Sequence, residues 1–189
     1  MLERGPTKYV RALEQIVRST PWLLEVLAAV RKCELPQAHL AAGAVRNTVW
    51  DVLHGRASPG ASSDLDVVYF DTGDVPNSTE ERLGTILPQF CWEVTNQATV
   101  HRWQSVDAGR AIEPYASLAA ALSSWPETAT AVAARLTDAG GLEFVAPFGL
   151  TDLFELRVRP NPKASNPVAY EVRRAQKQWQ ARWPKLCVL

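Results

Sequence analysis

Two aspartates, Asp64 and Asp66, stand two residues apart at the start of a run of apolar, β-branched and aromatic residues. Side chains at positions i and i+2 of a β-strand point to the same face, so these carboxylates would lie side by side. Adjacent carboxylates repel each other unless a cation or a shared proton offsets their charge. Because a donor set made only of oxygens favours Mg²⁺ or Mn²⁺, the pair predicts a divalent-metal site.

A second feature lies upstream, where Gly43 separates a short apolar stretch from a helical pattern with Arg46 near its start. Glycine permits a close approach of the backbone to a ligand, and the free N–H groups of a helix start favour an anion. The planar guanidinium of arginine can hold phosphate oxygens with two parallel hydrogen bonds. With the acidic pair, this turn predicts a metal-dependent site for a phosphorylated ligand.

The elements that must position these residues follow from the pattern of apolar residues, glycines and prolines. We expect strands at 39–42, 64–70, 90–95 and 142–146, helices at 6–19, 21–33, 43–53, 78–88, 124–136 and 167–181, and a short helix at 151–154. The helix at 124–136 is expected because Ser124 and Glu127 form a capping-box pattern. Residues 96–113 have no clear pattern.

The strand at 90–95 carries a further candidate. Its alternation places Cys91, Glu93 and Thr95 on one face and Trp92 and Val94 on the other. Glu93 is therefore an additional carboxylate on a strand downstream of the acidic pair.

The composition suits one compact α/β domain, because the chain has 189 residues, of which 47% are hydrophobic. Within it we expect N-terminal helices (1–35), a core (36–155) and a basic C-terminal segment (156–189). Lys plus Arg and Asp plus Glu both number 20, and this zero net charge disfavours a protein that tracks long stretches of nucleic acid. Trp179 and Trp183 of the basic segment could stack on a nucleobase, but packing against the domain is the expectation.

The three cysteines are an odd number without metal-type spacing, which is typical of reduced thiols in the cytosol. The first ten residues lack the apolar core of a signal peptide, and no apolar run approaches the ~20 residues that span a bilayer. We therefore expect a cytoplasmic protein that does not have a membrane as a partner.

The glycine turn followed by an Asp-x-Asp strand resembles the nucleotidyltransferase superfamily that includes DNA polymerase β and the CCA-adding enzymes. CCA-adding enzymes carry Gly-Gly-x-Val-Arg-Asp, then Leu-Gly-Arg, then Asp-x-Asp. The corresponding stretches here are Ala42 to Asn47, Leu53 to Arg56, and Asp64 to Asp66. Over almost the whole chain the sequence resembles a bacterial nucleotidyltransferase-like family, through strings such as AGAVRNTVWDVLHG, SSDLDVVYFD and APFGLTDLFELRVRPNP.

The resemblance implies an α+β fold with a mixed twisted sheet flanked by helices, with N-terminal helices and a C-terminal helical segment. It also implies transfer of a nucleoside monophosphate from an NTP to a hydroxyl-bearing acceptor, which could be a small molecule, a protein or a short RNA. Asp64, Asp66 and Glu93 would hold Mg²⁺ or Mn²⁺, and Glu93 would help to deprotonate the acceptor. The nucleotide-binding candidates are Gly43, Ala44, Arg46 and Asn47.

Three polar residues after Glu93 fall within the family-like stretch: Asn96, Gln97 and His101. They could line a pocket for the base or the acceptor. Alternatively, they could satisfy the backbone groups of a loop, as buried amides often do.

Two departures from the superfamily pattern keep a second hypothesis open. Gly43-Ala44 replaces the usual Gly-Gly or Gly-Ser, and the stretch from Val45 to Ser63 is longer than the typical spacing. The alternative is a non-catalytic module on the same fold that binds metal or nucleotide and acts as a regulator or antitoxin-like partner. A third hypothesis, RNA binding through the segment from Arg157 onward, predicts an affinity that falls steeply with ionic strength.

Overall fold

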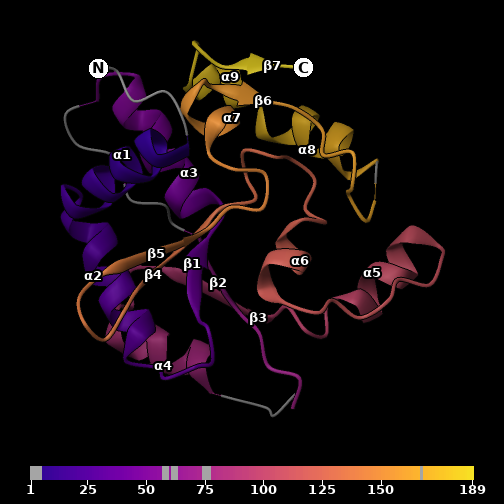
Figure 1. Cartoon of the computed structure of the whole chain (residues 1–189), viewed down its shortest axis with the longest axis horizontal. Coiled ribbons are helices and arrows are strands. Elements are labelled where there is room, and N and C mark those ends of the chain that lie inside the picture. Colours follow the sequence, from indigo (N-terminus) through magenta and orange to yellow (C-terminus); the bar gives the residue numbers. More distant parts are fainter. Residues whose placement is uncertain (1–5, 57–59, 61–63, 74–77, 167) are drawn as a thin grey trace.

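A five-stranded mixed sheet forms the centre of the computed structural model, which describes residues 6–56, 60, 64–73, 78–166 and 168–189 (Figure 1). Its strand order is β3-β2-β1-β4-β5. The strands are β1 (His39–Ala41), β2 (Asp64–Tyr69), β3 (Cys91–Asn96), β4 (Ala133–Leu136) and β5 (Leu142–Val145). β2 and β3 run parallel, whereas the other neighbours are antiparallel.

The main hydrophobic core lies against one face of this sheet. It is enclosed by α1 (Pro6–Arg18), α2 (Pro21–Arg31), α3 (Gly43–Leu53) and α4 (Thr79–Ile86). Leu40 of β1 and Leu65 and Val67 of β2 point into this core and are fully buried. The apolar side chains at alternate positions of β2 therefore fix which face of the strand is buried.

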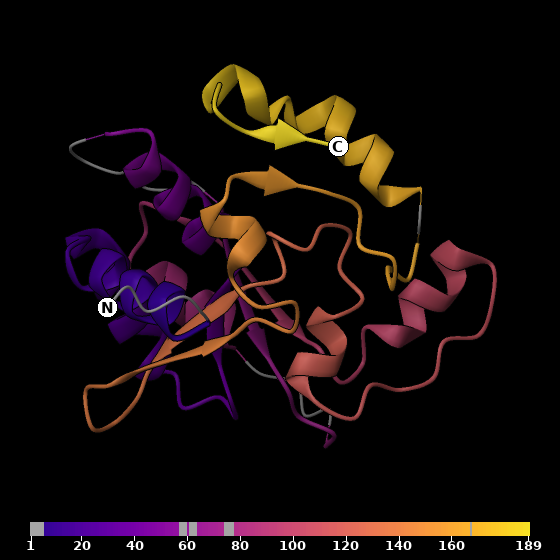
Figure 2. The ribbon, with the colours of Figure 1, turned by 45° about the horizontal axis from the view of Figure 1, so that its top comes forward.

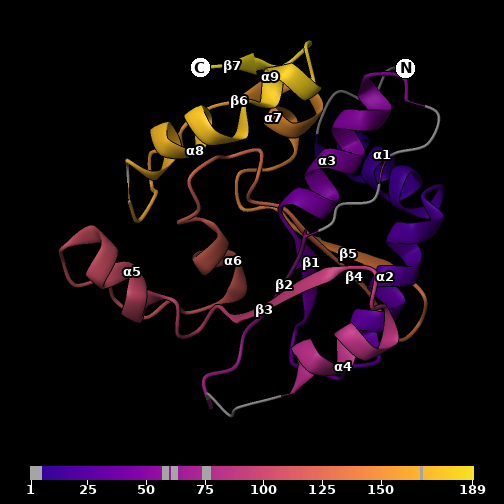
Figure 3. The same ribbon diagram turned by 180° about the vertical axis from the view of Figure 1, so that it is seen from behind.

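The opposite face of the sheet carries a smaller core. Ala41, Val68 and Ala133 pack there against Leu118 and Leu122 of α6 (Leu118–Leu122). Figures 1 and 3 show α6 and α5 (His101–Ala108) on the side of the sheet away from α2 and α4. This face is less completely covered by apolar side chains, and it is the face from which Asp66 projects.

The C-terminal segment lies along one side of the molecule (Figure 2). It follows α7 (Thr151–Phe154) and contains β6 (Arg157–Val158), α8 (Ala169–Lys177), α9 (Trp179–Arg182) and β7 (Cys187–Val188). β6 and β7 pair in parallel as a separate two-stranded sheet. Trp179 and Trp183 are buried in the main core, as expected from sequence, so this segment is part of the folded body.

Most elements expected from the sequence are confirmed to within a few residues, and so is the α+β fold with a mixed sheet flanked by helices. The helix expected at 124–136 is wrong, because residues 123–132 form no helix and β4 begins at Ala133. Glu127 does not cap a helix. Its carboxylate is fully buried and accepts a hydrogen bond from Arg173. The β-branched Thr128, Thr130 and Val132 also disfavour a helix there.

The single helix expected at 167–181 is also wrong. Gln178 has a left-handed conformation (φ 43°, ψ 44°) and separates α8 from α9. Pro167 lies outside the described residues. No helix in the described ranges is long and apolar enough to cross a membrane.

Candidate active site

Asp66 and Glu93 form the centre of the candidate site. They are direct register partners on the parallel strands β2 and β3, and both line a cavity of about 390 Å³. The cavity lies between the less covered face of the sheet, α5, the segment before β4 and the start of α8. The structure thus brings together two of the three carboxylates that the sequence predicts.

The electrostatic state of Asp66 reflects this neighbour. Burial and then the negative charge of Glu93 raise the pKa of the Asp66 carboxyl, while the positive charges of Arg46 and Arg173 oppose the rise. A half-buried carboxylate beside a second one is an arrangement that a cation stabilises.

Asp64 is placed differently. It lies opposite Cys91 in the register, its side chain is exposed, and it is not among the residues that line the cavity. Among the described residues, no three His, Cys, Asp or Glu side chains form a group that could hold a metal ion. The geometry therefore supports a donor set centred on Asp66 and Glu93.

The turn between β1 and α3 is unusual at Ala42. This residue has φ 49° and ψ −118°, a conformation that normally requires glycine. Its N–H donates to the Val132 carbonyl (3.0 Å), and its carbonyl accepts from the Arg46 N–H (2.9 Å). Ala42 lines the cavity, whereas Gly43 begins α3 and Ala44 is fully buried.

Arg46 lies behind the cavity wall. Its Nη1 donates to the Thr130 hydroxyl (2.7 Å), and its Nε and Nη2 donate to Asn47 Oδ1 (3.2 and 3.0 Å). The guanidinium carbon lies 4.9 Å from the ring centroid of Trp50 and 5.7 Å from that of Trp179. Burial lowers the pKa of Arg46 to about 10, so it remains a cation at neutral pH. Thr130 lines the cavity, and neither Arg46 nor Asn47 does.

The three polar residues after Glu93 have different roles. Asn96 Oδ1 accepts from the N–H groups of Asp71 and Ala98, and its Nδ2 donates to the Asp71 carbonyl. His101 begins α5, with its Nδ1 3.0 Å from the Ala98 carbonyl oxygen, and does not line the cavity. Gln97 does line it, and Oε1 of this buried side chain has no hydrogen-bond partner within the described part of the chain.

Sequence reasoning missed much of the cavity wall. α5 contributes Trp103, Gln104 and Asp107, the segment before β4 contributes Ser124, Trp125, Pro126 and Thr130, and the C-terminal segment contributes Ser165, Asn166, Ala169 and Arg173. The first group lies in residues without a clear pattern, and the second in the incorrectly expected helix. Only tertiary packing brings the third group to the site.

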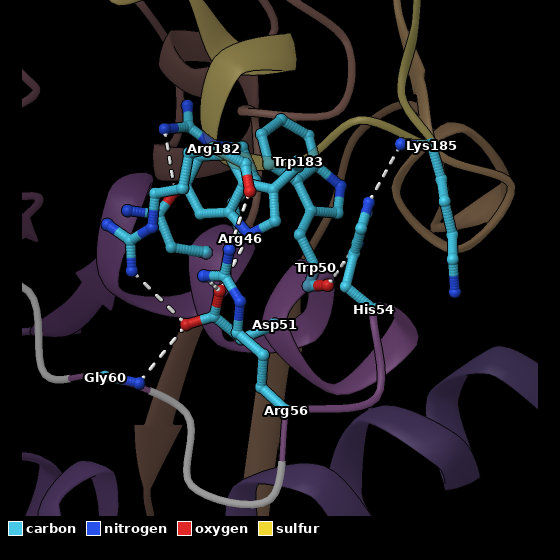
Figure 4. Close-up of polar contacts among 10 residues, drawn as sticks. Arg46, Trp50, Asp51, His54, Arg56, Gly60, Arg182, Trp183 and Lys185 are labelled. Atoms are coloured by element: carbon cyan, nitrogen blue, oxygen red, sulfur yellow. Dashed lines mark hydrogen bonds and ion pairs between the residues drawn. The ribbon is translucent and has the colours of Figure 1, made fainter.

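A buried carboxylate anchors the far end of α3 (Figure 4). Asp51 is fully buried and accepts hydrogen bonds from Trp183 Nε1 (2.7 Å), Arg182 Nη2 (3.3 Å), the Gly60 N–H (3.2 Å) and Arg56. This cluster fixes α9 against the helix that follows the Ala42 turn.

The comparisons with known proteins agree with this geometry. A nucleotidyltransferase family model matches residues 28–188. An NMR structure described as revealing a CCA-adding enzyme head domain is 30% identical, with a TM-score of 0.80 and 95% of each chain covered. No curated protein matches the sequence significantly.

Two larger solved structures are similar at a lower level. An apo tRNA-processing enzyme is 18% identical (TM-score 0.46), with 87% of this chain and 44% of that chain covered. The Bacillus stearothermophilus CCA-adding enzyme in complex with CTP is 18% identical (TM-score 0.42), with 92% and 38% covered. Scores below 0.5 add nothing to the assignment, which rests on the family model and the NMR structure. The chain belongs to the nucleotidyltransferase family, within the polymerase β-like superfamily.

Proposed function

We propose that this protein is a divalent-metal-dependent nucleotidyltransferase that moves a nucleoside monophosphate from an NTP to a hydroxyl-bearing acceptor. The observation that carries the proposal is the register pair of Asp66 and Glu93 in a cavity of about 390 Å³. That volume falls within the range of ligand sites, about 300–1,000 Å³. Family membership supports the same reaction class.

The chemistry of the two carboxylates fits a hard divalent cation. Both offer oxygen donors to one cavity, and the raised pKa of Asp66 reflects burial and a neighbouring negative charge that a cation would offset. Asp66 and Glu93 would hold Mg²⁺ or Mn²⁺, and Asp64 would join them only after a movement of its exposed side chain. A bound ion would neutralise charge on the phosphate oxygens.

The proposed transfer is an in-line displacement. The acceptor hydroxyl oxygen forms a bond to the α-phosphorus, and the bond from that phosphorus to the oxygen bridging to the β-phosphate breaks. Pyrophosphate leaves with the electron pair of this bond. The hydroxyl proton passes to the Glu93 carboxylate, which acts as a general base, and then to solvent.

The aromatic and amide residues of the wall would hold the base or the acceptor. Trp103 is 54% exposed and Trp125 is partly buried, and both line the cavity, where an aromatic face can stack on a base. Gln97 would use its amide to pair with a polar edge of the ligand, which would satisfy the unpartnered Oε1.

A second candidate function is nucleotide binding without turnover, as in a regulator or antitoxin-like module. The exposed position of Asp64 favours it, because only Asp66 and Glu93 of the three expected carboxylates line the described cavity. The unusual backbone conformation of Ala42 in the turn before α3 favours it as well.

One experiment separates the two functions. The protein is incubated with each α-labelled NTP, Mg²⁺ or Mn²⁺, and RNA, protein and small-molecule acceptors. We expect transfer that is lost in Asp66→Asn and Glu93→Gln and kept in the control Asp138→Asn. Metal-dependent NTP binding without transfer to any acceptor would favour the module, and no binding at all would contradict both functions. Asp64→Ala tests whether Asp64 is a third carboxylate that transfer requires.

A further inference from the structure

We infer that Arg173 of α8, held in place by the buried Glu127, binds the triphosphate of the nucleotide. The sequence assigns phosphate binding to Arg46. This inference rests on the proposed function and adds to it a positioning pair that lies outside the family-like turn.

The contact between these two residues fixes the orientation of the arginine. Arg173 Nε donates to Glu127 Oε1 (2.7 Å), and Arg173 Nη2 donates to Glu127 Oε2 (3.4 Å). The Glu127 side chain is 0% exposed, whereas 32% of the Arg173 side chain is exposed. This pair does not use Nη1, so a rigidly oriented guanidinium keeps donors for a ligand.

The position of Arg173 suits an anionic ligand. Arg173 lines the cavity that Asp66 and Glu93 also line. The positive charges of Arg173 and Lys177 both act on Asp66, so the cavity has carboxylates on one wall and cations within range of them. A triphosphate complexed with a divalent ion needs such an arrangement, with anionic groups for the ion and a cation for the remaining phosphate charge.

Arg46 is not available for this role. All three of its guanidinium nitrogens donate to Thr130 or Asn47, and the residue is 5% exposed. A buried Glu–Arg pair is weak evidence for stability, since apolar residues of similar size often serve as well. A fully buried carboxylate that orients a cavity-lining arginine is instead well suited to a binding role.

The test measures the affinity of the full chain for inorganic tripolyphosphate and for each NTP, all with Mg²⁺, by titration calorimetry. We expect Arg173→Met to weaken both affinities about 10- to 100-fold, the scale of charge-assisted hydrogen bonds. Arg173→Lys should weaken them less, since it keeps the charge and loses the planar fork. Arg174→Met is the matched control, because this neighbour on α8 faces Glu171 at 3.8 Å and does not line the cavity.

Arg173→Met leaves Glu127 buried without its partner and could unfold the protein. The double variant Glu127→Gln/Arg173→Met removes the unpaired charge and should show the same loss of affinity. Unchanged affinity in a folded Arg173→Met or double variant would overturn the inference while leaving the proposed function intact. If the wild-type chain bound neither tripolyphosphate nor any NTP, the proposed function itself would fail.

Discussion

Asp66 combines a structural cost with the chemical use that we propose for it. Its carboxylate is half-buried and directly opposite Glu93 in the register, so the metal-free protein holds two like charges together. Natural sequences tolerate such conflicts mainly at functional sites.

We therefore predict that Asp66→Asn stabilises the metal-free protein while it abolishes transfer. The free energy of unfolding should rise by up to about 1 kcal/mol, the upper scale of cross-strand pair energies, because the repulsion is removed. Urea unfolding of the metal-free variant checks this. Asp64→Asn, at an exposed position, should change the free energy by less. A loss of stability in Asp66→Asn would contradict the assignment.

The raised pKa of Asp66 also predicts a pH dependence. The folded protein binds this proton more tightly than the unfolded chain, so the contribution of Asp66 to stability falls as pH rises from the ordinary aspartate pKa through the raised one. Metal binding needs the ionised carboxylate, so Mg²⁺ affinity should rise over the same pH window. Calorimetric Mg²⁺ titrations at several pH values measure this. An affinity independent of pH across that window would show that Asp66 is not a ligand.

At the scale of elements, the turn between β1 and α3 holds an alanine in a backbone conformation that alanine disfavours. Ala42 has φ 49° and ψ −118°, and such a sparsely populated backbone conformation costs a residue with a Cβ roughly 1–3 kcal/mol. Both backbone hydrogen bonds of Ala42 hold it there, one to Val132 and one from Arg46.

We predict that Ala42→Gly raises the free energy of unfolding by about 1 kcal/mol, because relief of strain exceeds the entropy cost of glycine. Chemical denaturation measures the change. Ala44→Gly, inside α3, is the control and should destabilise, since glycine is unfavourable in a helix and Ala44 is fully buried. Equal destabilisation by both substitutions would show that the Ala42 turn is not strained.

The elements that sequence pattern predicts correctly are those whose signal is local. Alternation along β2 and β3 divides the side chains of each strand between two faces, because the period of a strand is two residues wherever it lies. The parallel pairing of the two strands then places Asp66 opposite Glu93. The helix expected at 124–136 is absent for the opposite reason. Glu127 accepts a hydrogen bond from Arg173, 46 positions later, and no local pattern predicts that contact.

The residues of the candidate site also fall into those that local sequence pattern identifies and those that only tertiary packing places. Asp66, Glu93 and Gln97 line the cavity, and they lie in or just after the two strands that the sequence identifies. Arg46 does not line the cavity; it donates to Thr130 and lies 5.7 Å from the Trp179 ring, and no helical periodicity could place either residue beside it. Arg173 could not be found because its role depends on how the C-terminal segment docks.

At the scale of the whole molecule, arginines of the basic C-terminal segment form ion pairs with carboxylates elsewhere in the chain. Arg159 pairs with Asp152, Arg173 with Glu127, and Arg182 with Asp51. These contacts bind the segment to the rest of the chain, which supports our proposal that residues 1–189 form one folding unit.

We predict that a chain ending at Gln178 loses its cooperative unfolding transition. The truncation removes Trp179, Trp183 and Leu186 from the main core and leaves Asp51 buried without two of its donors. Loss of a buried Trp side chain alone costs about 3–5 kcal/mol, against a total stability of about 5–15 kcal/mol. Thermal unfolding followed by circular dichroism, with the full chain as control, measures this. A sharp transition at the full-chain midpoint would contradict the prediction.

The Asp51 cluster has a consequence for the order of events during synthesis. Asp51 and its partner Trp183 are separated by 132 positions, so α3 leaves the ribosome long before the indole that completes its surroundings. Until then, a carboxylate that will be buried has to stay hydrated, and α3, which follows the Ala42 turn, cannot reach its final packing. Contacts this distant in sequence slow folding and prolong the exposure of apolar surface. The nascent chain therefore completes the packing behind the candidate site only after Trp183 has left the ribosome.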